Sequence, residues 1–180
     1  MQSKSQRSKN HSARSLAQLL STKVPITKAM GLRVLKCEIE NGVRFALPLK
    51  PNRNHKNTAF GGSLIAAQAL ACWALICELL DKNNLLAEVV VQRQTGEFLR
   101  PVSGSFEVQT DAVRPKAVKR FLETMRRHNK ARLQLTARVL LRGHVAGRYT
   151  GEYVALSISK KATKHKVKRQ AKRFSKQQRT

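Results

Sequence analysis

Apolar residues follow two different patterns along this chain. Over residues 43–49 and 132–142, large apolar residues alternate with polar or small ones, which predicts β-strands that bury one face. The stretch 62–80 is instead apolar at nearly every position. This predicts a helix that is surrounded by protein rather than lying on a surface. Together the two patterns predict an α+β fold in which antiparallel strands wrap around one long central apolar helix.

Shorter patterns predict the remaining elements. Asn41-Gly42 lies between two apolar runs and predicts a hairpin, because both turn residues accept positive φ. A capping-box sequence predicts a short helix near residues 12–21. Apolar residues at helical spacing predict an amphipathic helix over residues 115–128, with a basic outer face. Further strands are predicted over residues 33–40, 85–95, 106–110 and 145–158.

Charge divides the chain into three parts. The formal net charge is +26, from 36 Lys and Arg against ten Asp and Glu. Every acidic residue lies between Glu38 and Glu152, so both ends of the chain are purely basic. We therefore expect a basic disordered N-terminus over 1–15, one folded domain over 16–159 and a basic disordered tail over 160–180. The basic tails can bind polyanions non-specifically, or they can serve only to keep the protein soluble.

The cysteine pattern, the length of the apolar run and the spacing of possible metal ligands each narrow the class of protein. Cys37, Cys72 and Cys77 form no Cys-x-x-Cys motif, and we expect buried free thiols in a cytoplasmic protein. The basic N-terminus lacks the apolar core of a secretory signal. The run 64–77 is alanine-rich, contains Gln68 and is shorter than the roughly 20 apolar residues that a bilayer needs, so we expect no membrane span. The histidines and cysteines lack metal-ligand spacing, so we expect no metal.

Candidate chemistry lies in the polar segment that leads directly into the apolar helix, Asn54-His55-Lys56-Asn57-Thr58-Ala59-Phe60-Gly61-Gly62-Ser63. A glycine-containing loop that opens a buried helix presents free backbone N–H groups at the helix start. Such groups can hold an anion, or a carbonyl oxygen that becomes negative during a reaction.

The order of elements and the segment 51–63 resemble the hotdog-fold thioesterase superfamily. The closest likeness is to a bacterial thioesterase-like domain that occurs alone or fused behind an acetyltransferase domain. The segment Phe98–Gly104 also resembles that family's strand end, and the likeness covers about residues 16–158. It implies a homodimer or dimer of dimers with a continuous sheet and sites at the interface. It also implies acyl-CoA or acyl carrier protein as partner, with no cofactor besides the coenzyme A or phosphopantetheine of the substrate.

One branch of the superfamily has an Asn, six intervening residues, Gly-Gly, and an acid seven residues after the second glycine. Asn54, Gly61 and Gly62 match this pattern, which implies that the Asn side chain and a glycine N–H orient the thioester carbonyl. The branch's acid falls on Ala69, which cannot accept a proton, and Gln68 beside it can only orient a water. These matches give the catalytic candidates Asn54, Gly61, Gly62 and Gln68. The substrate-binding candidates are Thr58, Phe60, Ser63 and Arg100.

Each candidate also has a plain structural interpretation. Asn54 can hold its loop by an Asx turn, and Gly61 and Gly62 can be present because they allow a helix and a strand to pack closely together. Ser63 suits a helix N-cap better than a nucleophile, and Gln68 can satisfy a backbone group in the core. The predicted function is hydrolysis of acyl-CoA or acyl-carrier-protein thioesters. The alternatives are a non-catalytic acyl-thioester binder and a nucleic-acid-associated hotdog scaffold that uses the basic tails.

Overall fold

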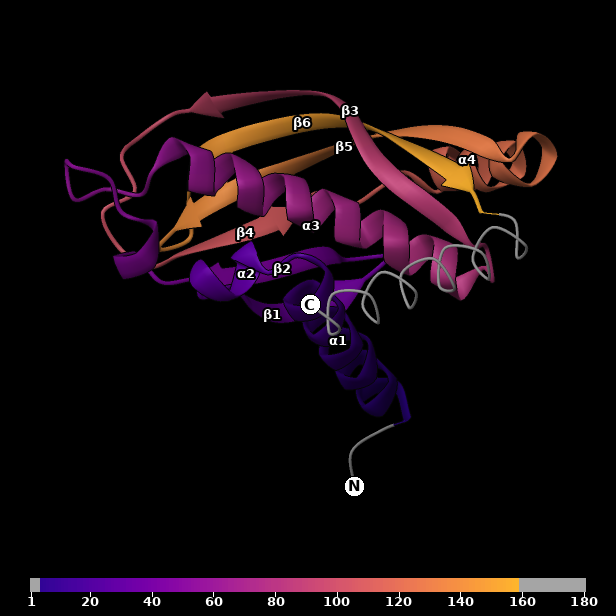
Figure 1. Ribbon diagram of the computed structural model, residues 1–180, viewed down its shortest axis with the longest axis horizontal. Helices are drawn as coiled ribbons and strands as arrows, with labels where there is room; N and C mark the ends of the chain where they lie inside the picture. Colours follow the sequence, from indigo (N-terminus) through magenta and orange to yellow (C-terminus); the bar gives the residue numbers. More distant parts are fainter. Residues whose placement is uncertain (1–3, 159–180) are drawn as a thin grey trace, which may run out of the picture.

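A six-stranded antiparallel sheet curves around one long helix in the computed structural model (Figure 1). The structure describes residues 4–158, with side chains from residue 13 onward. Its elements are α1 (Lys4–Lys23), α2 (Ile26–Ala29), β1 (Arg33–Glu38), β2 (Gly42–Leu47), a 3-10 turn (Lys50–Asn52), α3 (Gly61–Lys82), β3 (Ala87–Phe98), β4 (Phe106–Thr110), α4 (Pro115–His128), β5 (Lys130–Leu141) and β6 (His144–Ser157). The strand order is β1-β2-β4-β5-β6-β3. The predicted α+β architecture is confirmed.

Helix α3 carries apolar side chains on nearly all of its sides, and burying them against the inner face of the sheet stabilises its central position. Alternate residues of the strands point toward the helix; in β5 these are Ala131, Leu133, Leu135, Ala137 and Val139, all buried. Among the described residues, α3 is also the one helix that is long and apolar enough to cross a membrane. A core helix meets the same test of length and composition, and here the sheet covers it.

The sheet has two edge strands of different length. β1 has six residues, carries Arg33 and Lys36, and its pairing with β2 shifts register between Val34 and Lys36. β3 has twelve residues, and its pairing with β6 shifts register between Val91 and Arg93. Residues 90–100 are exposed along this edge.

Helix α3 separates two ends of the molecule that are used as reference points below. The loop end carries residues 54–63 and 98–102, and the α4 end carries α4 and the adjoining start of β5 (Figure 1). With 22 residues in α3, the two ends lie about 33 Å apart along the helix axis.

Some local predictions need correction. Helix α1 begins at Lys4, so it includes most of the segment 1–15 that we assigned to a disordered N-terminus. The hairpin at Asn41-Gly42 is present, but only Gly42 has positive φ (+80°), while the amide of Asn41 donates to the Glu38 carboxylate (2.6 Å). The predicted disordered tail, residues 160–180, lies outside the described residues.

Candidate functional site

The start of α3 is open. Phe60 is the N-cap residue, with extended backbone and no side-chain capping bond, and the first helical bond runs from the N–H of Leu64 to the Phe60 carbonyl (3.1 Å). The N–H groups of Gly61, Gly62 and Ser63 therefore have no acceptor within the described part of the chain. Ser63 lies inside the helix, so its predicted role as N-cap is wrong.

Two aromatic rings cover this helix start, and they explain both glycines. A Cβ on Gly61 would lie 3.1 Å from the ring of Phe98, and a Cβ on Gly62 would collide with the ring of Phe60. Both rings are more than half exposed, at 58% for Phe98 and 57% for Phe60. The glycines thus allow the two rings to lie close to the first turn of α3, as expected for close approach.

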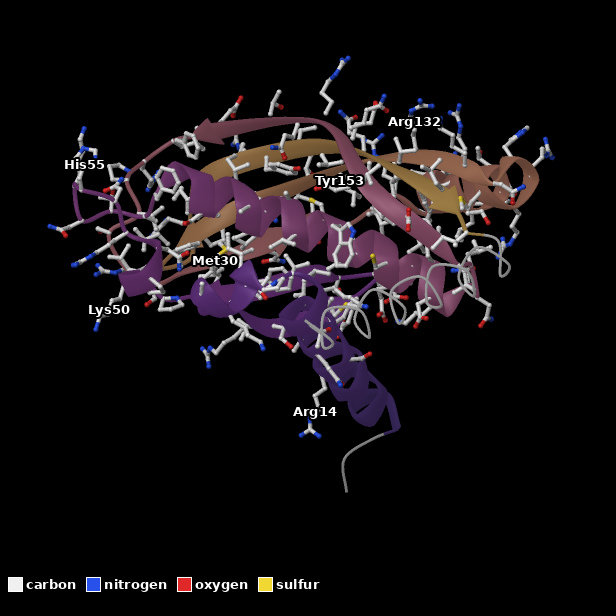
Figure 2. The ribbon with its side chains drawn as sticks, in the orientation of Figure 1. Arg14, Met30, Lys50, His55, Arg132 and Tyr153 are labelled. Carbon is white, nitrogen blue, oxygen red and sulfur yellow. The ribbon has the colours of Figure 1, made fainter. Side chains whose placement is uncertain are left out.

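Asn54 organises the loop that precedes the helix. Its Oδ1 accepts the backbone N–H of Lys56 (2.9 Å) and of Thr58 (3.2 Å), and its Nδ2 donates to the hydroxyl of Thr58 (3.1 Å). The Asx-turn interpretation is therefore correct. An amide nitrogen carries two hydrogens, and the second has no acceptor among the residues described. Asn54 can hold the loop and still donate to a ligand. His55, at the tip of the same loop, points away from the body of the protein (Figure 2).

A cavity of about 400 Å³ opens at this end. Its walls combine apolar side chains with the helix start, and its lining residues include Thr58, Gly61, Leu64, Phe98, Leu99 and Arg100. A mostly apolar cavity with a few convergent polar groups is typical of a small-molecule site. No Asp or Glu belongs to the described lining. Across residues 4–158, no cluster of three or more His, Cys, Asp or Glu residues is placed to hold a metal.

Gln68 lies apart from this cavity. Its side chain is 1% exposed, and its Nε2 donates to the backbone carbonyl of Ala137 on β5 (3.2 Å). Of the predicted site residues, the structure brings Asn54, Thr58, Phe60, Gly61, Gly62, Ser63 and Arg100 to the loop end. Gln68 faces the sheet in the core.

A pair of tyrosines near Ala69 was not predicted. The hydroxyl of Tyr153 donates to the Ala69 carbonyl (2.8 Å) and lies 2.9 Å from the hydroxyl of Tyr149, which donates to Oε1 of Gln94 on β3 (3.0 Å). Figure 2 shows Tyr153 between α3 and the sheet. Burial raises the pKa of both hydroxyls, so they remain protonated and act as donors rather than bases. Their spacing of four along one strand places both on the same face, which was the available signal.

Comparison with known proteins identifies the family. Residues 13–157 match the family described as "Putative thioesterase (yiiD_Cterm)". The chain belongs to this family. Its fold is the hotdog fold predicted from the sequence, and solved structures agree with that assignment.

Three solved structures are similar to this member of the family over most of both chains. A protein of unknown function from Chlorobaculum tepidum is 27% identical, with 81% of this chain and 94% of that chain covered and a TM-score of 0.76. A putative thioesterase from Shewanella oneidensis is 21% identical (82% and 99% covered, TM-score 0.69). A probable thioesterase from Pseudomonas aeruginosa is 22% identical (81% and 95% covered, TM-score 0.68).

Proposed function

We propose that this protein hydrolyses acyl thioesters of coenzyme A or of an acyl carrier protein at the loop end. One observation carries the proposal: the helix start with its uncapped N–H groups reaches a largely apolar cavity through Gly61, and Thr58 in the same lining binds Asn54, whose amide has a spare hydrogen. Membership of a thioesterase family supports the same reaction class.

In this mechanism the acyl carbonyl oxygen accepts hydrogen bonds from Nδ2 of Asn54 and from the N–H of Gly61 or Gly62. As water attacks the carbonyl carbon, charge develops on that oxygen, and fixed donors stabilise it. The C–S bond then breaks, which gives the carboxylic acid and releases the thiol. Thr58 keeps the Asn54 carboxamide oriented through its hydroxyl and N–H. The N–H of Ser63 adds a third donor of the same helix start.

The cavity walls suit the rest of the substrate. Phe98 and Leu99 line the cavity with partly exposed apolar side chains, and the exposed ring of Phe60 lies next to Gly62; these groups can hold an acyl chain or the pantetheine arm by burying its apolar surface. Arg100 lines the same cavity, and its guanidinium suits a phosphate group of coenzyme A or phosphopantetheine.

The described lining of the cavity contains no Asp, Glu or His side chain that could activate water as a base. Ala69 occupies the position of the acid in the related branch, and both nearby tyrosines are held protonated. We assign no step to Gln68, because its amide is bound to the Ala137 carbonyl. The described lining holds no carboxylate, and this observation favours non-catalytic binding of acyl thioesters as the second candidate function.

We also propose that the protein acts as a homodimer joined along β3. This strand is a long sheet edge with exposed Val90 (50%) and Val91 (44%). An exposed, partly apolar edge strand offers unpaired N–H and C=O groups to another strand. Antiparallel pairing of two β3 strands continues the sheet and brings the partner's side chains toward each cavity.

The substitution Asn54→Asp tests the donor role directly. The aspartate keeps an oxygen that accepts from Lys56 and Thr58, so the loop retains its shape, but the amide donor is replaced by an acceptor. Thioester hydrolysis, measured as thiol release across short, medium and long acyl-CoAs, is expected to fall at least about tenfold, as loss of one oxyanion donor can cost more than this.

Asn57→Asp is the matched control, because it makes the same charge change at an exposed position of the same loop. Unchanged hydrolysis in Asn54→Asp would remove Asn54 from the mechanism. Binding of a non-hydrolysable thioether analogue by a wild-type protein that releases no thiol would select the non-catalytic binder instead.

A further inference from the structure

A basic groove lies at the α4 end, far from the thioester cavity. It runs between α4 and β5, has a volume of about 710 Å³, and its charged lining residues are Arg114, Arg120, Lys130 and Arg132 with a single acid, Asp111. Arg132 lies on the side of the sheet away from α3 (Figure 2). Residues from both faces of β5 line the groove, and its four cations, Arg114, Arg120, Lys130 and Arg132, are all exposed to solvent.

The acids near this groove are already engaged. The carboxylate of Asp111 pairs with Arg138 (2.7 Å) and accepts the hydroxyl of Thr136 (2.6 Å). Glu123 on α4 is 4.0 Å from Lys119, and both side chains are largely exposed. Neither acid neutralises the cations that line the groove.

The cations themselves are largely unpaired. The outer face of α4 adds Lys116, Lys119, Arg126 and Arg127 to the cations of the groove, and we call this whole set the α4 basic face. Lys119, Arg126 and Arg132 have side-chain partners. Within the described residues, the members whose side chains have no ion-pair or hydrogen-bond partner are Arg114, Lys116, Arg120, Arg127 and Lys130. Crowded like charges without partners repel each other, and a bound polyanion would relieve that repulsion.

The extent of the α4 basic face indicates a long anion. Helix α4 has 14 residues and so extends for about 20 Å, with cations along its full length. A single phosphate group needs only a few donors at one point. A nucleic-acid duplex instead presents about one negative charge every 1.7 Å along its axis, which matches cations spread over such a distance.

The side chains between these cations do not favour insertion into a membrane or stacking with single-stranded bases. The exposed residues of α4 are polar or charged apart from Pro115, so the face lacks the apolar residues that insert a helix into a membrane surface. Phe121, the aromatic residue of this helix, is 2% exposed. Without an exposed aromatic side chain the face offers no platform for stacking the bases of a single strand.

We propose that the α4 basic face binds the phosphate backbone of a nucleic-acid duplex without reading base sequence. Its lysine and arginine side chains contact phosphates, and release of counterions from the duplex drives binding. The formal net charge of +26 adds long-range attraction to the same partner. Within one chain this binding surface and the thioester cavity share no lining residue, because they lie at opposite ends of α3.

The test compares two variants of the full chain with equal change in net charge. Lys116→Gln, Arg120→Gln and Arg127→Gln together neutralise part of the α4 basic face, and glutamine keeps the helix propensity of α4. Lys23→Gln, Lys28→Gln and Lys50→Gln together neutralise exposed lysines on other elements. Thermal unfolding verifies that both variants fold like the wild type.

Fluorescence anisotropy is measured with DNA and RNA duplexes of about 20 base pairs, each in two unrelated sequences, over a series of salt concentrations. The α4 triple variant is expected to lose at least about tenfold in affinity near 100 mM KCl, and its slope of log K against log salt is expected to fall by about three. The loss should be equal for both sequences. The affinity of the triple variant on other elements should stay close to that of the wild type. Whichever duplex binds more tightly, DNA or RNA, is the preferred partner.

Four results would overturn the proposal. These are no duplex binding by the wild-type chain, equal losses in the two triple variants, tighter binding of a single strand than of a duplex, and preferential binding of poly-glutamate or of phosphatidylserine vesicles. Equal losses of affinity would show that binding depends on the overall positive charge and not on the α4 basic face. A failure of thioester hydrolysis leaves this measurement unaffected, because no thioester is present in it.

Discussion

The two ends of α3 differ in how their polar groups are used. At the loop end, Asn54 and Thr58 bind each other, and two rings pack over two glycines, so the remaining donors point in fixed directions. At the α4 end, cations crowd one surface and most have no partner within the described chain. The first arrangement depends on the position of single atoms, and the second on the number of like charges. Single substitutions should therefore act strongly at the loop end and cumulatively at the α4 end.

The largest expected effect comes from comparing two phenylalanine substitutions, one that lowers stability and one that weakens ligand binding. Phe121 at the α4 end is 2% exposed, and Phe60 at the loop end is 57% exposed. Phe121→Ala should lower the free energy of unfolding by about 3–5 kcal/mol, because it leaves a cavity between α4 and β5. Phe60→Ala should cost less than about 1 kcal/mol yet weaken binding of acyl thioesters. Urea unfolding measures the first quantity and analogue binding the second; equal stability losses would contradict the contrast.

An intermediate effect is expected at the β3 edge. If two β3 strands pair antiparallel about a two-fold axis, the α4 end of one protomer lies beside the loop end of the other. Val90→Lys with Val91→Lys would place unpaired charges in that interface, at a cost of about 3 kcal/mol to the dimer. Analytical ultracentrifugation should then show a shift toward monomer, accompanied by loss of thiol release.

Leu156→Lys is the control for that variant, since Leu156 is 39% exposed and lies on β6, next to the edge strand. It should leave the dimer intact. A double variant at Val90 and Val91 that sediments like the wild type would show that β3 is not the interface, and the two ends would then act independently.

The smallest expected effect concerns Gly62→Ala. The added Cβ would displace the ring of Phe60, which is exposed and can move, so the free energy of unfolding should not fall. Alanine also favours a helix over glycine. Thiol release should nevertheless drop about tenfold, or about 1.4 kcal/mol, because the ring no longer covers the helix start. In the control Gly104→Ala, the new Cβ lies 3.6 Å from Leu141, and activity should be retained; equal activities would show that the ring position is unimportant.

The sequence predicts the fold well because the relevant signals are local. Alternation in β5 places Leu133 and Leu135 on the inner face, and the all-round apolarity of residues 62–80 predicts the central position of α3. Both predictions are confirmed by the burial of these residues. Helix ends are weaker signals, since Ser63 looks like a capping residue but the chain enters the helix three residues earlier, at Phe60.

The candidate site was only partly predictable, because contacts across the sheet depend on register. The loop from Asn54 to Ser63 is contiguous, so its members could be grouped from sequence alone. Gln68 donates to Ala137, 69 positions away, and no local pattern reveals that partner. The contact between Tyr149 and Gln94 likewise follows from the pairing of β6 with β3.

The unequal edges of the sheet limit how many copies can add to one another. Fibrous growth by strand addition needs an open edge on both sides of every sheet. β3 has twelve residues and is exposed, whereas β1 has only six and is contacted by α1. A short edge strand that another element covers discourages a further strand. In the proposed dimer, addition through β3 would therefore stop at a closed pair, which would protect the sheet from open-ended polymerisation.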